Sequence, residues 1–400
     1  MTDLLWPGDH RAGDLMSDRA FFDAMVAVEN AWLNLLVDIG PAPQKARVDL
    51  GALTSVGDVE TVAAGAESDG NPVVGLVALL RERTGGEAAR WLHRGLTSQD
   101  VVDTALMMCL RDALSAVHDE MTTHVRILLG LVESHRNSPM AARTLTQPAL
   151  PSTAAAKFAN WLSGVLDAAD ALAAVPWLPV QLGGAVGTHA ATTELVGSPD
   201  EALTLADTLA GAVGLTTAAP WHTTRAVVTR AGDALVGCCD ACGHIAADVA
   251  VGSRAEIGEL VEGSGGGSST MPHKRNPVLS VLIRRAALAA PALGATLHAA
   301  SAASVDERSD GGWHAEWAAL RTLTRRTVVA MRQTSDLLTG LHVDVQRAGD
   351  NLGAAGDLLA EQRLMSELVG RTTRADYLGA SGHLIDAVAH RARRHLKETM

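Results

Sequence analysis

Apolar residues recur three and four positions apart over long stretches of this 400-residue chain, which places them on one face of an α-helix. The spacing is clearest over residues 102–117 and 158–169. It also occurs after Ser17, a residue type that caps helix N-termini, and it ends at a Gly-Pro pair at positions 40 and 41. No stretch alternates convincingly like a β-strand, and no fixed-period repeat is present. The pattern predicts an all-α protein built as a bundle of long helices with short breaks.

The composition narrows the function classes. Hydrophobic residues make up 47% of the chain but aromatic residues only 3%, so the core is expected to be aliphatic, as suits closely packed helices. The net charge of −12 argues against nucleic-acid binding, because phosphate backbones select basic surfaces. An acidic protein that binds small anions needs local arginine, lysine and backbone N–H groups for that purpose.

The cysteines and the chain start predict a cytoplasmic protein. Four cysteines in a chain of this length do not make a disulfide framework. Cys238, Cys242 and His244 lie close in sequence, but no second ligand pair of zinc-site spacing accompanies them, so we expect buried thiols. The N-terminus lacks a signal-peptide pattern. Residues 286–305 contain no Asp, Glu, Lys or Arg, yet they are rich in small residues and contain Pro291 and His298, which predicts a buried helix and no membrane span.

One segment departs from the helical pattern. Residues 262–277 read E-G-S-G-G-G-S-S-T-M-P-H-K-R-N-P, which is too rich in glycine and proline for a helix. The glycines alone are typical of a flexible linker. A nucleotide loop is excluded, because no Gly-Lys-Ser/Thr follows and the dinucleotide spacing is not met. Two serines, a lysine and an amide donor on a glycine hinge predict a catalytic lid.

Residues 267–277 resemble the signature loop of the fumarase/aspartase superfamily, most closely that of its adenylosuccinate lyase and 3-carboxy-cis,cis-muconate cycloisomerase branches. Residues 93–100 (H-R-G-L-T-S-Q-D) are similar to the first conserved region of this superfamily. Arg143 and Thr144, with Gln147 behind them, are similar to the second. Taken alone, residues 97–100 are typical of a helix cap, and Arg143 of a surface arginine.

The resemblance implies an architecture. It implies an all-α, three-domain fold that assembles as a homotetramer around a twenty-helix core, with active sites where regions of three subunits meet. The implied domains are an N-terminal helical domain over residues 1–95, a central long-helix bundle over 96–335 with the serine loop at 262–277, and a short C-terminal domain over 336–400.

The resemblance also implies site residues and a mechanism. A base removes a proton alpha to a carboxylate, which gives an aci-carboxylate, and the group on the neighbouring carbon leaves. Ser268 is implied as the base, and Lys274 and Asn276 as groups that bind the developing charge on a small polycarboxylate. The remaining implied substrate-binding residues are His93, Thr97, Ser98, Arg143, Thr144 and Gln147. Neither a metal nor an organic cofactor is implied.

The leaving group distinguishes the branches. Adenylosuccinate lyases protonate a departing nitrogen with a histidine where this chain has Leu145, and a supporting histidine is replaced by residues 70–72 (G-N-P). A carboxylate has an intrinsic pKa of about 4 and leaves a muconolactone without a proton. Residues 70–72, 178–185 and 313–317 are similar to the cycloisomerase branch, although the last, W-H-A-E-W, also fits core packing.

Two departures keep alternatives open. Pro148 stands where cycloisomerases often carry histidine, and the chain after residue 335 is short. A lyase acting on another substituted succinate, of the adenylosuccinate or nitrosuccinate type, is therefore an alternative. A non-catalytic structural homologue is an alternative of a different class.

Overall fold

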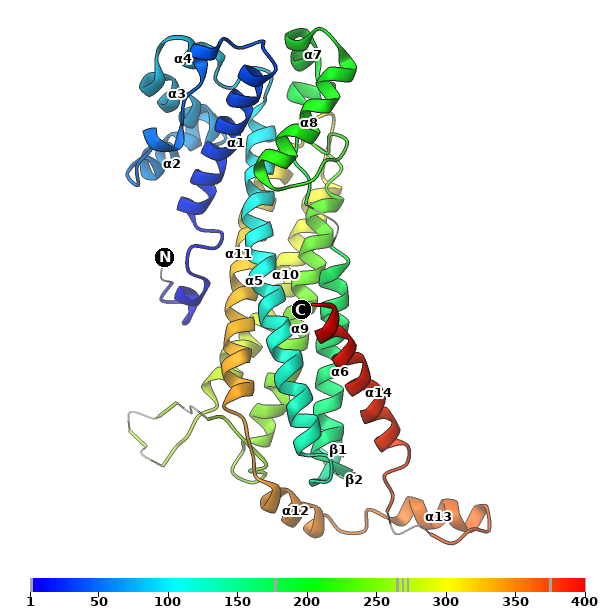
Figure 1. The fold of residues 1–400 in the computed structure, drawn as a ribbon. Helices are drawn as coiled ribbons and strands as arrows, with labels where there is room; N and C mark the ends of the chain where they lie inside the picture. Colours follow the sequence, from blue (N-terminus) through cyan, green and yellow to red (C-terminus); the bar gives the residue numbers. More distant parts are fainter. Residues whose placement is uncertain are drawn as a thin grey trace. The chain divides into compact units, whose positions relative to one another are not determined.

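The structure is a computed structural model, and it describes residues 3–175, 178–263, 266–267, 270–271, 273–373 and 376–399. It is predominantly helical, which confirms the predicted all-α class (Figure 1). The α-helices are α1 (Asp18–Asp38), α2 (Asp58–Asp69), α3 (Val73–Thr84), α4 (Gly86–Trp91), α5 (Ser98–Ser134), α6 (Ala154–Ala173), α7 (Ala190–Val196), α8 (Pro199–Val213), α9 (Ala226–Gly252), α10 (Val278–Ala302), α11 (Gly312–Thr339), α12 (Val345–Ala354), α13 (Ala360–Leu368) and α14 (Ser381–Glu398).

A β-hairpin corrects the expectation that no strand would occur. β1 (Pro139–Thr144) pairs antiparallel with β2 (Gln147–Thr153), and the hairpin connects α5 to α6 (Figure 1). A shorter antiparallel pair joins β3 (Leu260–Val261) to β4 (His342–Val343). Alternation did not reveal β1 and β2, because neither strand alternates between buried and exposed positions and β2 contains two prolines.

The contacts between Cα atoms divide the chain into two compact units. The first comprises Met1–Ala116, Val175–Asp233 and Ala292–Arg325, and the second comprises Val117–Ala174, Ala234–Pro291 and Arg326–Met400. Both units are therefore assembled from three separated segments of the chain. The three-domain division over residues 1–95, 96–335 and 336–400 remains a prediction.

Helix α1 contributes many buried residues to the core of the first unit. Ser17 caps this helix as predicted, since its hydroxyl accepts a hydrogen bond from the Ala20 N–H at 3.0 Å. Trp32 is fully buried, and its indole N–H donates to the Arg94 carbonyl oxygen at 2.6 Å. That bond fixes the segment that leads into α5, where the first predicted site residues lie.

The core of the second unit contains the cysteine cluster. Cys238, Cys239 and Cys242 are buried free thiols on α9, which confirms the expectation of buried cysteines. Burial raises the pKa of Cys239 to about 11 and that of Cys242 to about 12. These thiols therefore remain protonated and unreactive at neutral pH.

Three helices, α1, α9 and α10, are long and apolar enough to cross a membrane by length and composition alone. Their most apolar windows are buried within the structure to 61%, 44% and 28%, respectively. The expectation that residues 286–305 form a buried helix is therefore wrong for the single chain, because most of the apolar window of α10 is uncovered. Small residues such as alanine and glycine make this surface suitable for close helix packing.

Candidate active site

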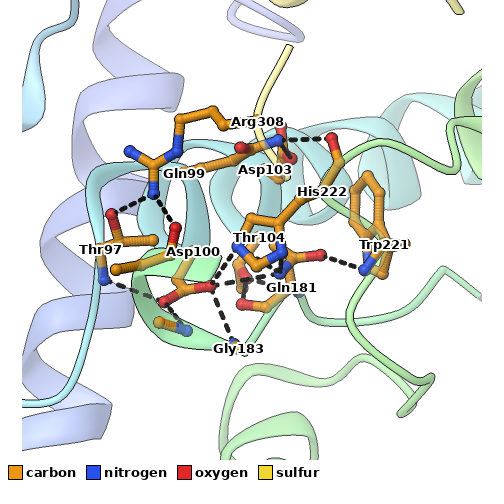
Figure 2. A network of polar contacts seen from close by, with 12 residues as sticks. Thr97, Gln99, Asp100, Asp103, Thr104, Gln181, Gly183, Trp221, His222 and Arg308 are labelled. Carbon is orange, nitrogen blue, oxygen red and sulfur yellow. Dashed lines mark hydrogen bonds and ion pairs between the residues drawn. The ribbon is translucent and has the colours of Figure 1, made fainter. Parts of the chain in front are cut away.

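Asp100 organises the start of α5, the helix that begins at Ser98. Its carboxylate is 1% exposed and accepts hydrogen bonds from the backbone N–H groups of Thr97 at 2.9 Å, Gly183 at 3.0 Å and Gly184 at 3.0 Å (Figure 2). The bond to Thr97 is half of a capping box, so the helix-cap interpretation of residues 97–100 is confirmed. The two bonds to the glycines also attach the helix start to the loop that follows residue 178.

Gln181 connects this carboxylate to a buried histidine. Its side-chain amide donates to Asp100 at 3.3 Å, and its amide oxygen accepts from the Trp221 N–H at 2.8 Å (Figure 2). The His222 Nε2 atom lies 3.5 Å from the Asp100 carboxylate. A Cβ atom at position 183 would lie 2.8 Å from the His222 ring, so only glycine fits there without displacing the histidine.

A second buried ion cluster continues the same network. The Arg225 guanidinium donates to Asp103 at 2.7 and 3.1 Å and to Glu316 at 3.1 Å, and it lies over the Trp221 ring at 4.6 Å. Burial alone would lower the pKa of Arg225, but the two carboxylates raise it. Residues 313–317 therefore do take part in core packing, because Trp313 also donates to Asp103 at 2.9 Å.

Arg308 is an exposed cation at the start of α5. Its Nη2 donates to the Thr97 hydroxyl oxygen at 2.6 Å and to the Ala185 carbonyl oxygen at 3.1 Å (Figure 2). Thr97 and Ser98 are half-buried, and the Thr97 hydroxyl and the guanidinium occur together at a helix N-terminus. This arrangement combines positive charge, hydroxyl donors and the helix dipole, which suits a carboxylate.

His93 lies just upstream of this site. Its Nδ1 is 2.5 Å from the carboxylate of Glu29, which is fully buried, and its backbone φ of 63° is in the left-handed region. The pairing fixes the orientation of the imidazole. His93, Thr97 and Ser98 are thus the predicted site residues that belong to the first unit.

The remaining predicted residues belong to the second unit, and Arg143 is the most constrained of them. Its guanidinium makes two hydrogen bonds to the buried Glu259 carboxylate, at 2.6 and 2.8 Å. These bonds raise the pKa of Arg143. Arg143 therefore holds the hairpin to the segment before β3, and a substrate contact for it remains a prediction. Thr144 and Gln147 close the hairpin opposite each other and are exposed.

Ser268 lies outside the described residues, but the two ends of its loop are described. Gly266 and Asn276 exchange two backbone hydrogen bonds of 2.9 Å, which close the base of the loop. Glu262 accepts from the N–H groups of Leu279 at 3.1 Å and Ser280 at 2.7 Å, and so caps α10 directly after the loop. Lys274 is exposed, and together with Asn276 it lines a cavity of about 410 Å³.

Several residues of this site were not found from the sequence. Asp100 was part of the 93–100 stretch and was interpreted as a helix cap but not as a site residue, and Gln181 was only part of the 178–185 stretch. His222 and Arg308 carry only weak local signals, because each acts through contacts to segments far away in the sequence. A Pro-Trp-His break before a long helix and an isolated arginine between two helices were the available cues.

Known proteins of one family resemble this chain over most of its length. A family model described as lyase matches residues 54–291. Nitrosuccinate lyase of Streptomyces davaonensis is 38% identical over 383 residues, which cover 92% of this chain and 81% of that protein. The 3-carboxy-cis,cis-muconate cycloisomerase of Bradyrhizobium diazoefficiens is 35% identical over 397 residues, covering 96% and 86%. The crystal structure of 3-carboxy-cis,cis-muconate lactonizing enzyme from Pseudomonas putida matches with a TM-score of 0.81 at 31% identity, covering 96% of this chain and 86% of that chain.

Proposed function

The chain belongs to the fumarase/aspartase superfamily of lyases and is an enzyme, and on this premise we propose that it interconverts 3-carboxy-cis,cis-muconate and the corresponding carboxymuconolactone. This reaction belongs to the protocatechuate/β-ketoadipate route of aromatic catabolism. The chain belongs to a superfamily of enzymes, and its loop residues are intact. Both facts argue against the alternative of a non-catalytic structural homologue.

The observation that carries the proposal is the side chain at position 145. Leu145 stands at the hairpin tip where an amine-expelling lyase would carry its general acid, and it is 96% exposed. Asn71, at the position of the supporting histidine, bonds to the backbone of its own segment: its side-chain oxygen accepts from the Val73 N–H at 3.0 Å. Neither residue can donate a proton to a departing nitrogen, and a carboxylate leaving group does not need one.

The mechanism follows from the groups available. In the delactonising direction Ser268 takes the proton alpha to a carboxylate, the electron pair forms a C=C bond, and the ring C–O bond breaks to release a carboxylate. Lys274 and Asn276 stabilise the negative charge that develops on the aci-carboxylate. We propose that Arg308 and the start of α5 hold a second carboxylate, because a cation and a helix N-terminus occur together there. No step in this scheme requires a metal or organic cofactor.

A nitrosuccinate-type lyase is the second candidate. The 38% identity to nitrosuccinate lyase supports it, and nitrite also leaves without protonation. An adenylosuccinate-type reaction is less well supported, because no general acid is present to protonate its departing nitrogen. General acid catalysis contributes roughly 10²–10⁴-fold, so turnover of adenylosuccinate should be reduced by at least that factor.

We also propose a cytoplasmic homotetramer with active sites shared between subunits. Two observations support it: the predicted site residues are distributed over both compact units, and the apolar window of α10 is only 28% buried in one chain. A partner helix would cover that surface. We expect the protein to bind a small polycarboxylate, and to bind neither nucleic acid nor a membrane.

One experiment distinguishes the candidates. Purified protein is given 3-carboxy-cis,cis-muconate, nitrosuccinate and adenylosuccinate under identical conditions after chelation and dialysis. We expect loss of conjugated-diene absorbance with the first substrate. If the protein converts only nitrosuccinate and releases nitrite, the proposed function changes from cycloisomerase to nitrosuccinate lyase. Efficient fumarate release from adenylosuccinate would contradict both assignments. Light scattering of the same sample measures the subunit number.

A further inference from the structure

Glu262 is a buried acid at the point where the chain enters the serine loop. It is 6% exposed, although glutamate is rarely buried in proteins. Val261, the residue before it, pairs with His342 in the β3–β4 ladder. A Cβ atom at position 263 would lie 2.6 Å from the Gly340 carbonyl oxygen, so only glycine fits directly after Glu262. The backbone is therefore fixed on both sides of this acid.

The carboxylate reaches from the residue before the loop to the helix after it. The first N–H groups of α10 have no acceptor within the helix. One carboxylate oxygen of Glu262 accepts from the Leu279 N–H at 3.1 Å, and the other accepts from the Ser280 N–H at 2.7 Å. A negative charge is favourable at this end of a helix. Glu262 thus determines where the first turn of α10 lies relative to the start of the loop.

The residues that follow from this first turn are the predicted charge-binding residues. The Asn276 carbonyl oxygen accepts from the Val278 N–H at 2.9 Å, and the Asn276 backbone also pairs with Gly266. Lys274 lies two residues earlier in the chain. Lys274, Asn276 and Glu262 all line the cavity of about 410 Å³ at the base of the loop. A displacement of the start of α10 would therefore be passed on to Asn276 and Lys274.

From these contacts we propose that Glu262 is a positioning residue, whose carboxylate fixes the start of α10 and so directs Lys274 and Asn276 toward the charge that develops on the substrate. The inference rests on the proposed function. That charge is greater in the transition state than in the bound substrate, so misplacement of the two residues should lower kcat more than it raises KM. Glu262 also occupies the N-terminus of α10, which would otherwise attract a substrate carboxylate itself.

The test removes the carboxylate and then supplies one from solution. Glu262→Ala leaves the Leu279 and Ser280 N–H groups without their acceptor, beside a cavity that is large enough for formate. On the substrate that the wild type converts, kcat should fall by about tenfold or more while KM changes by less than about threefold. Sodium formate should then raise kcat by about fivefold, whereas formamide, which is neutral, should not.

Two further variants serve as controls. Glu262→Gln keeps the size of the side chain and one acceptor oxygen but lacks the charge. Its kcat should also fall with KM nearly unchanged, and formate should not restore it, because the side chain still fills the space. Glu256→Ala removes an exposed glutamate of the same compact unit and should leave kcat and its response to formate as in the wild type.

A stability measurement distinguishes positioning from a purely structural role. Without substrate, formate should raise the midpoint of thermal unfolding of Glu262→Ala by about 2 °C, because it binds only the folded state. If formate restores this midpoint but not kcat, Glu262 is structural only and the inference is wrong. Wild-type kcat in either Glu262 variant would also contradict it. A wild type that converts neither 3-carboxymuconate nor nitrosuccinate would refute the proposed function, and the positioning role with it.

Discussion

The start of α5 and the tip of the β1–β2 hairpin both contain predicted site residues, but they are built in opposite ways. At the start of α5, Gln99 and Asp100 are 0% and 1% exposed, and the Asp100 carboxylate accepts hydrogen bonds from two segments of the chain. At the hairpin tip, residues 144–148 are all exposed. The first region is preorganised by its own buried polar contacts, whereas the second presents solvent-exposed side chains on a hairpin turn.

Replacing the predicted base should give the largest effect on activity. Ser268→Ala should reduce kcat by roughly 10³-fold or more, because it removes the group that takes the proton. Ser269→Ala, one residue away, is the matched control and should have a smaller effect. Turnover rates, with circular dichroism to verify folding, provide the measurement. A larger loss in the Ser269 variant would show that the base is assigned to the wrong serine.

The next effect concerns the buried region and should appear as lost stability. Asp100→Ala removes the acceptor of three backbone N–H groups and leaves those of Gly183 and Gly184 buried without a partner. Each unsatisfied group costs about 1–3 kcal/mol, so the free energy of unfolding should fall by about 3 kcal/mol or more. Urea denaturation measures it. An unchanged midpoint would mean that the start of α5 is not held by this carboxylate.

At the exposed hairpin tip we expect the opposite result: activity should fall while the free energy of unfolding stays nearly unchanged. Gln147→Ala at the hairpin tip should change the free energy of unfolding by less than about 0.5 kcal/mol, since the side chain is exposed. Its kcat/KM should fall by about tenfold, which corresponds to one hydrogen bond to a charged substrate. Gln346→Ala, an exposed glutamine on α12, is the control and should leave both quantities unchanged. Loss of stability without loss of activity would reverse the comparison.

The smallest effect is a pH dependence within the buried region. Burial lowers the pKa of His189, and so does His222, while Asp100 acts in the opposite direction. Because the pKa in the folded state is below the unfolded value of about 6.5, the unfolded chain binds the extra proton first, and stability falls as the pH drops below about 6.5. His189→Asn tolerates the φ of 54° and should make this decline shallower. Denaturation midpoints at pH 7 and pH 5.5 provide the test, and equal slopes would refute it.

The sequence by itself determined the helical class, the helix that begins after Ser17 and the position of the serine loop. Helical periodicity and cap residues are local signals, since they depend on neighbours three or four positions away. The loop was found because eleven consecutive residues form one motif. The same local signals failed for the hairpin, where pairing across the turn stabilises strands whose own sequences contain prolines and no favoured turn residue.

Only the tertiary structure decided how the start of α5 is held. Asp100, Gln181 and His222 are separated by 81 and 41 positions in the chain, and they meet because α5, the loop after residue 178 and the segment before α9 pack together. Glu259 holds Arg143 although the two residues are 116 positions apart, and no local sequence pattern predicts this pair. Buried polar groups must find hydrogen-bond partners wherever the fold supplies them, and those partners are set by packing rather than by sequence spacing.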